Sequence, residues 1–227
     1  MFVHVASRDR SAVPWATWLV LAACTVPAIV LTLVPESERL DVMLRWGTVP
    51  NQLFAGGAWS WDALRAARPE TLITAVFVHA DWLHLVGNLV FLLIFGLAAE
   101  RRLGAGRFLA LMLSCGAFAN LVGAMTLGSS GAPIVGASGA VSAIVGAYLT
   151  LFPNARLGIV LPLGLFLEFV RMPAAILIAF WAILQVLFSF VGPAFGAIAW
   201  WVHIAGFLAG IVFAMLSRPA IAKRQRR

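Results

Sequence analysis

The sequence has few charged side chains. Of its 227 residues, 11% are charged and 62% are hydrophobic. A soluble domain averages about a quarter charged residues, so this composition argues against a water-soluble globule. Charge-free runs extend from Ser11 to Pro35, from Phe108 to Ala155 and from Met172 to Ser217. Since a membrane-spanning helix needs about 20 apolar residues, the second and third runs are each long enough for two spans.

The sequence is also poor in cysteine. Cys24 and Cys115 are the only two cysteines, and neither forms a metal-ligand spacing with a histidine. This argues against a disulfide framework and against a structural metal site. A His-Glu-x-x-His helix and nucleotide-binding motifs are absent as well, so we expect no metal, ATP or organic cofactor.

Alternating ten-residue segments, which are typical of membrane β-barrels, are missing, so the apolar runs should be helices. Turn signals at Gly128–Pro133 and Val191–Pro193 divide the two long runs. The first run could be a signal peptide, but its length and the lack of a small-residue cleavage site favour a retained helix. The predicted fold is an all-α polytopic membrane protein with six transmembrane helices, near residues 14–34, 76–99, 106–127, 135–152, 173–190 and 197–217.

The predicted membrane domain therefore covers residues 14–217, between a short N-terminal segment (1–13) and a basic tail (218–227). The stretch Leu157–Val170 contains Pro162, Gly164 and Glu168. Because it is short and broken, we expect a buried or interfacial loop there.

The net charge is +7, and the tail Lys223–Arg227 could suggest nucleic-acid binding. Basic ends of membrane proteins have a commoner cause, because positive charge prefers the cytoplasmic side. With six spans, 12 of the 16 basic residues lie on the side of the two termini. The other four lie in loop one, the segment between the first and second spans (Arg39, Arg45, Arg65 and Arg68). We therefore expect both termini in the cytoplasm and no nucleic-acid partner.

Three apolar segments carry strongly polar side chains. Such groups are expensive in a membrane and are functional candidates. The first segment holds His79-x4-His84-x3-Asn88, the second holds Ser138 within Gly136-Ala137-Ser138-Gly139, and the third holds His203-x2-Gly206-x3-Gly210. In the predicted topology all of them lie early in spans that run inward, about 6–10 Å below the outer surface. This common depth predicts one shared site.

Side-chain direction agrees with a shared site. His84 and Asn88 are four residues apart and therefore lie on one helix face. Span four carries small residues at Ser138, Ser142 and Gly146, and span six carries glycines at 206 and 210. Such stripes let two helices approach closely, which would bring His203 within hydrogen-bonding reach of the Ser138 hydroxyl. The stripes suit internal packing and self-association equally, so they predict no particular oligomeric state.

From about Thr71 to Ser217 the sequence resembles the rhomboid intramembrane serine proteases, in their minimal six-helix bacterial form. The resemblance rests on the three polar motifs above and on a fourth, Glu100-Arg101-Arg102-Leu103-Gly104. It implies a dyad in which Ser138 is the nucleophile and His203 the general base. It also implies that the oxyanion is held by His84, Asn88 and the Ser138 N–H.

By the same resemblance His79 supports the site. Gly136 and Gly139 fit a tight entry of the chain into the fourth helix, with backbone close to the substrate. The Glu100 cluster is implied to be structural. The substrates implied are transmembrane helices that enter beside span five and are cut near the outer face. The implied location is the bacterial inner membrane, with the lipid bilayer as the other partner.

The sequence departs from the family pattern at two places. The family often has a Trp-Arg pair before the first motif histidine, where this chain has Glu70 and Thr71. Some members have a tyrosine that stacks on the base, where this chain has Ser142. Another residue must then orient His203, and the candidates are Trp200, Trp201 and His79.

Three other functions are compatible with parts of this pattern. A catalytically silent rhomboid-like scaffold or chaperone would share the fold, although such members usually lack the serine or the histidine. A small transporter could use the histidines as a proton relay, which would favour inverted repeats. A zinc protease could use His79, His84 and His203 as ligands.

Overall fold

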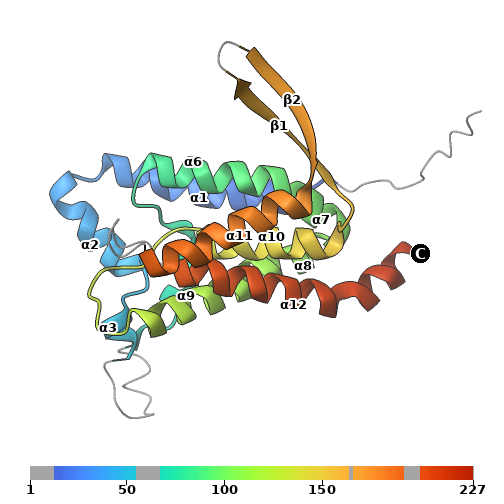
Figure 1. Cartoon of the computed structure of the whole chain (residues 1–227). Coiled ribbons are helices and arrows are strands. Elements are labelled where there is room, and N and C mark those ends of the chain that lie inside the picture. Colours follow the sequence, from blue (N-terminus) through green and yellow to red (C-terminus); the bar gives the residue numbers. More distant parts are fainter. Residues whose placement is uncertain (1–12, 55–66, 164–165, 192–199, 227) are drawn as a thin grey trace, which may run out of the picture.

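The computed structural model describes residues 13–54, 67–163, 166–191 and 200–226. Several sequence predictions lie outside these ranges, among them Arg65 of loop one, the Gly192-Pro193 turn and the segment 1–12. The described part is a bundle of helices that lie side by side. The first long helix begins, and the last one ends, at the same end of the bundle (Figure 1).

Five helices in the described part are long and apolar enough to cross a membrane. Two of them contain a π-helical turn, η2 or η3, in the middle. The five are α1 (Trp15–Leu33), α6–η2–α7 (Trp82–Phe91, Leu92–Gly96, Leu97–Leu103), α8–η3–α9 (Ala105–Ala110, Leu111–Cys115, Gly116–Thr126), α11 (Ala174–Val191) and α12 (Trp200–Gln225).

The fourth predicted span is shorter than expected. Helix α10 (Ser138–Leu151) has 14 residues, about 21 Å, where a bilayer core measures about 30 Å. By length, therefore, the prediction of six spanning helices is not confirmed. Residues Gly139 to Tyr148 of α10 are all buried, which is typical of a helix surrounded by protein. Its apolar sequence reflects packing inside the bundle.

The second span also begins later than predicted. Residues Thr71–Thr74 (α5) and Ala75–Phe77 (η1) form separate short turns, and α6 begins at Trp82 rather than near residue 76. Asp81 ends this interruption, because its Oδ1 accepts a hydrogen bond from the His84 N–H at 2.8 Å. An aspartate at this position is a strong N-cap. His79 consequently lies in the loop ahead of the helix.

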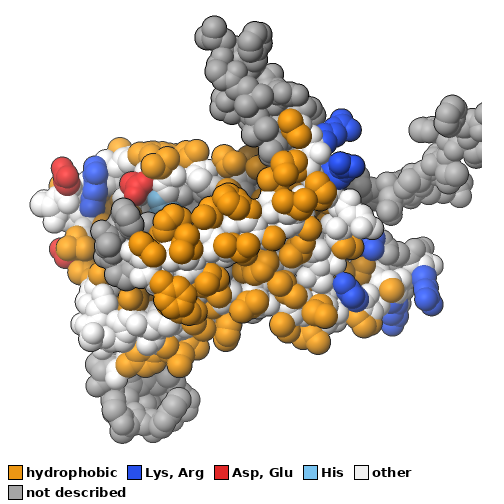
Figure 2. Space-filling view, viewed as in Figure 1, with side chains coloured by type: hydrophobic (Ala, Val, Ile, Leu, Met, Phe, Trp, Pro, Cys, Tyr) orange, Lys and Arg blue, Asp and Glu red, His pale blue; other side chains and the backbone are white. Residues whose placement is uncertain are grey.

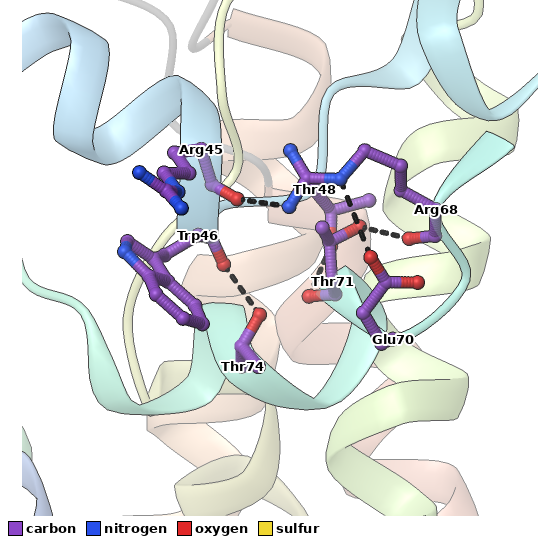
Figure 3. A network of polar contacts seen from close by, with 7 residues as sticks. All are labelled: Arg45, Trp46, Thr48, Arg68, Glu70, Thr71 and Thr74. Atoms are coloured by element: carbon purple, nitrogen blue, oxygen red, sulfur yellow. Dashed lines mark hydrogen bonds and ion pairs between the residues drawn. The ribbon is translucent and has the colours of Figure 1, made fainter. Parts of the chain in front are cut away.

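Loop one folds over the end of the bundle through helices α2 (Glu36–Trp46) and α3 (Pro50–Leu53). Threonine side chains tie it to α5, as Figure 3 shows. Thr48 Oγ1 donates to the Thr71 carbonyl at 2.9 Å, and Thr74 Oγ1 donates to the Trp46 carbonyl at 2.7 Å. These bonds anchor the described part of loop one to α5, whose first residue, Thr71, is one of the positions at which this chain departs from the family pattern it resembles.

Arg68 extends the same network (Figure 3). Its Nη2 donates to the Arg45 carbonyl at 2.6 Å, and its Nε lies 3.3 Å from Glu70 Oε1. The Arg68 carbonyl accepts from Thr71 Oγ1 at 2.8 Å, and Arg68 has a φ of 49°. A left-handed backbone at a non-glycine residue persists only when its surroundings hold it. Glu70 and Thr71 therefore take part in fixing this turn.

The stretch predicted as a buried or interfacial loop is instead a β-hairpin. Strands β1 (Arg156–Leu163) and β2 (Phe166–Pro173) pair antiparallel, from Arg156 opposite Pro173 to Leu163 opposite Phe166. The hairpin projects from the bundle (Figure 1). Both strands of a two-stranded sheet are edges, so Pro162 is tolerated, and the β-branched residues Ile159, Val160 and Val170 favour strands. The loop prediction gave too much weight to Pro162 and Gly164.

Glu100 of α7 is buried, and its carboxylate contacts the first turn of α1. Its Oε1 accepts from the Ala16 N–H at 2.9 Å, and its Oε2 accepts from the Thr17 N–H at 2.6 Å and from Thr17 Oγ1 at 2.7 Å. The first N–H groups of a helix lack partners within that helix and carry partial positive charge. A carboxylate from α7 thus caps α1, which agrees with the structural role expected for Glu100.

Charge is segregated on the surface. Figure 2 shows hydrophobic side chains over the middle of the bundle and basic side chains gathered at the end where α12 finishes. One of the basic residues has a specific contact, because Arg224 Nη2 donates to the carbonyls of Arg101 and Arg102 at 2.8 and 2.9 Å. This interaction caps the C-terminus of α7 with a cation. Helix α12 itself continues to Gln225, beyond the predicted end of the span at 217.

Helices α10 and α12 pack backbone to backbone, as the small-residue stripes predict. A Cβ on Gly206 would collide with the Gly139 carbonyl, and one on Gly210 would collide with the Ala143 carbonyl. On the other helix, a Cβ on Gly146 would collide with the Phe207 carbonyl. Small residues at these positions are therefore what fixes the distance between α10 and α12.

Candidate active site

Ser138 and His203 face each other across the close contact of α10 and α12. Ser138 is the first residue of α10, and His203 lies in the first turn of α12. The Ser138 Oγ lies 2.9 Å from His203 Nε2, within hydrogen-bonding distance. Both residues are half-buried. A hydroxyl and an imidazole nitrogen at this separation meet the geometric requirement for a serine activated by a base.

The turn before Ser138 requires glycine. Gly136 has a φ of 113°, which L side chains rarely adopt, and its N–H donates to the Ala75 carbonyl at 2.9 Å. A Cβ at this position would also run into the His84 imidazole. Gly139 is equally constrained, because its Cβ would meet Val202 and Ala119. The chain thus enters α10 through a tight turn at Gly136 and a crowded position at Gly139, and the closeness of this backbone to a substrate stays a prediction.

His79 and His84 lie on the other side of this turn. The His79 Nε2 accepts a hydrogen bond from the Ala137 N–H at 3.3 Å, and the rings of His79 and His84 meet edge to face at 5.2 Å. His79 is buried, whereas His84 is half-buried. The structure thus brings His79 to the backbone beside Ser138 and His84 to the cavity itself.

Asn88 lies one helical turn after His84. Its Nδ2 donates to the His84 carbonyl at 3.0 Å, and its side chain lines the same cavity as Ser138 and His203. The Ser138 N–H belongs to the first turn of α10, where backbone donors have no partner four residues earlier in the helix. The His84 imidazole, the Asn88 amide and the first residue of α10 therefore line the cavity that holds the Ser138 hydroxyl.

Two cavities meet at the pair Ser138 and His203. One has a volume of about 580 Å³ and opens between the segment before α10, Asp81 and Trp200. The other, of about 230 Å³, is lined by helices α6, α10, α11 and α12. Apolar side chains such as Phe91, Val145 and Trp181 line the second cavity.

His203 has a partner that sequence reasoning missed. Its Nδ1 lies 2.8 Å from the Oε1 of Gln185, a buried residue of α11. Of the three residues expected to orient His203, Trp200 contacts the ring edge to face, with centroids 6.0 Å apart. Trp201 is exposed, and the ring of His79 contacts His84. Gln185 is the only glutamine or asparagine in the run from Met172 to Ser217, so the cost of polar groups in a membrane would have marked it.

The described residues form no group of three or more His, Cys, Asp or Glu side chains arranged to hold a metal ion. Cys24 and Cys115 are both free and buried. The zinc arrangement considered from the sequence, with His79, His84 and His203 as ligands, thus has no counterpart in the described part of the chain.

Comparison with known proteins gives the same family for most of the chain. Residues 66–220 match the family profile described as "Rhomboid domain". The chain is 27% identical to "Rhomboid protease GlpG" of Salmonella paratyphi A, over 98% of this chain and 70% of that protein. It is 30% identical to "Rhomboid protease GluP" of Bacillus subtilis, over 60% of this chain and 24% of that protein.

A third relative, "RHOMBOID-like protein 12, mitochondrial" of Arabidopsis thaliana, is 33% identical over 63% of this chain and 46% of that protein. The chain thus spans about a quarter and about half of the lengths of the GluP and Arabidopsis relatives. The family profile covers well over half of the chain, and five helices in its described part are long and apolar enough to cross a membrane. This integral membrane protein therefore belongs to the rhomboid family.

Proposed function

We propose that this protein is an intramembrane serine protease that cleaves transmembrane helices of other proteins with Ser138 and His203 as a dyad. The observation that carries the proposal is the 2.9 Å separation of Ser138 Oγ and His203 Nε2 beside a cavity lined by membrane helices. The protease names of the GlpG and GluP relatives support the same reaction class.

In the proposed mechanism the Ser138 oxygen attacks the scissile carbonyl carbon while His203 Nε2 takes the hydroxyl proton. His203 then returns that proton to the leaving amine, and water hydrolyses the resulting acyl-enzyme by the reverse exchange. The packing of α10 on α12 supports this mechanism. Both residues lie on helices whose backbones are in direct contact, so Ser138 Oγ and His203 Nε2 are held at a fixed separation.

The negative oxygen of the tetrahedral intermediate would be held by His84, Asn88 and the Ser138 N–H. His84 and Asn88 line the cavity around Ser138, and the N-terminus of α10 adds the positive end of a helix dipole. In this proposal His79 holds the Ala137 backbone, while Gly136 and Gly139 keep space for His84 and for the helix contact.

The proposed substrates are transmembrane helices, which must unwind locally before cleavage because their amides are bonded internally. The apolar cavity between α6 and α11 suits a substrate side chain in this position. We further propose that α10 acts as a short sixth span within a membrane domain of residues 14–217, with both termini in the cytoplasm and the site toward the outer face of a bacterial inner membrane. The basic end of the bundle supports this orientation (Figure 2).

The test is cleavage of a reporter transmembrane substrate by the purified protein in liposomes. The wild-type protein should cut the reporter, and Ser138→Ala should reduce the rate at least about a thousandfold while its helical content stays the same. A variant that cuts as fast as the wild type would show that Ser138 is not the nucleophile. A folded wild-type protein that binds but never cuts any such reporter would favour the scaffold alternative.

A further inference from the structure

Gln185 is the one polar contact of α11 with the proposed dyad. Three residues of α11 at helical spacing, two of them aromatic, make specific contacts with α12. Trp181 packs on Phe207 with ring centroids 5.8 Å apart, and Phe188 stacks on Trp200 at 5.1 Å. Gln185 lies between them, buried, with its Oε1 2.8 Å from His203 Nδ1. The two aromatic contacts hold the helix face that presents the amide to the imidazole.

The direction of this hydrogen bond follows from chemistry. An amide oxygen can only accept, so the His203 Nδ1 must carry the proton. A neutral imidazole has one ring proton, which leaves a lone pair on Nε2, the nitrogen that faces Ser138 Oγ at 2.9 Å. The opposite tautomer would point an N–H at Ser138 and could not take its proton.

We propose that Gln185 is a positioning residue that holds His203 in the tautomer able to deprotonate Ser138. It replaces the carboxylate of a Ser-His-Asp triad with a neutral acceptor, which avoids burying a charge within the membrane. The bond to Gln185 also strengthens when His203 becomes cationic during the reaction, because a charged donor makes the stronger hydrogen bond. This inference rests on the proposed protease function.

Placing this residue on α11 has a consequence. The other members of the site lie on α6, α10 and α12, or just ahead of α6 and α10 in the case of His79 and Gly136. Helix α11 is the least enclosed of the five long helices, since 17% of its residues are buried against 33–50% in an 18-residue stretch of each of the others. Its other polar side chain, Ser189, donates to its own helix at the Val186 carbonyl. The ability of His203 to act as a base therefore depends, through the Gln185 side chain, on the position of α11, which borders the apolar cavity.

The experiment compares two substitutions of similar size with a control on the lipid-facing side of the same helix. Gln185→Met removes the acceptor, Gln185→Glu keeps an oxygen acceptor and adds charge, and Leu187→Met alters an exposed residue of α11. The titratable groups facing His203 in the described part are His84 on α6 and Asp81 at its N-cap, and none of the variants changes them.

We expect Gln185→Met to lower kcat about ten- to a hundredfold with KM within about twofold, and Leu187→Met to leave both within about twofold. For Gln185→Glu the acid limb of the pH–rate profile should move upward by about one pH unit, because a carboxylate stabilises the imidazolium. Wild-type kcat in Gln185→Met, or an unmoved acid limb in Gln185→Glu, would overturn the proposal. If Gln185→Met does not fold, the pH profile of Gln185→Glu decides alone.

A second measurement does not depend on proteolysis. Nitrogen-15 NMR of labelled histidine, with the signal assigned through His203→Ala, should find the proton of neutral His203 on Nδ1 in the wild type and a mixture of tautomers in Gln185→Met. If the protein never cleaves a substrate but shows these tautomers, the protease proposal is refuted and the positioning of the His203 tautomer by Gln185 is still supported. A wild-type His203 protonated on Nε2 overturns the role of Gln185 whatever the activity.

Discussion

Gly206 of α12 lies directly against the backbone carbonyl of Gly139 of α10. These residues are neighbours of His203 and Ser138, three positions and one position along their helices. The contact sets how near the two helices come where the hydroxyl and the imidazole meet. The same contact therefore sets the geometry of the proposed dyad and the packing of the two helices, and a methyl group at one position should disturb both.

Gly206→Ala should lower the melting temperature and reduce cleavage more than about tenfold, because the added Cβ must displace α12 from α10. Gly106→Ala is the matched control, since a Cβ at Gly106 meets nothing within 4 Å. Cleavage rates and thermal melts of both variants check this. Equal behaviour of the two variants would mean that the distance between α10 and α12 is not critical.

Glu100→Ala should destabilise the fold by about 2–4 kcal/mol, because it leaves two N–H groups of α1 and the Thr17 hydroxyl without their acceptor. Thr17→Val removes one of these bonds and should cost about 1 kcal/mol. Unfolding in mixed micelles measures both. Folded Glu100→Ala protein should cleave at the wild-type rate, and a large loss of kcat at full folding would contradict a purely structural role.

The network of loop one offers a comparison between a buried and an exposed contact (Figure 3). Thr48→Val should destabilise the protein by about 1 kcal/mol, because the buried Thr71 carbonyl loses one of its two donors and keeps only the Ala75 N–H. Glu70→Gln should cost less than about 0.5 kcal/mol, since the Arg68–Glu70 pair is exposed to solvent. Thermal melts decide this, and the reverse ranking would show that the ion pair anchors the loop.

Cleavage should depend on pH through His203. Only the neutral imidazole accepts the Ser138 proton, so the rate should rise with pH as His203 loses its proton and then level off. The midpoint of this rise should coincide with the titration of His203 followed by NMR. A rate that falls across that titration, or that ignores it, would contradict a general-base role.

Much of this arrangement could be predicted from the sequence. Apolar runs located the long helices, and small residues at four-residue spacing indicated that the helices of Ser138 and His203 approach closely. The cost of polar groups in a membrane singled out the residues that the structure gathers around one cavity. These predictions work because backbone N–H and C=O groups in lipid must bond within the protein, which leaves helices and closed barrels as the only spanning structures.

What the sequence did not predict depends on contacts between distant segments. The hydropathy of α10 gives no sign that it stops after 14 residues, because burial in protein and burial in lipid favour the same side chains. The strand pairing of β1 with β2 was hidden by Pro162 and Gly164. Gln185 could have been singled out as the only amide in its apolar run, but its partner, the imidazole 18 residues later, depends on how α11 packs against α12.

The most direct test of the central claim is labelling with a fluorophosphonate probe, which reacts with a serine only when a base activates it. We predict that the wild-type protein is labelled on Ser138, as located by peptide mass spectrometry, and that both Ser138→Ala and His203→Ala abolish the label. Undiminished labelling in the folded His203→Ala variant, or a label on any other serine, would contradict the account.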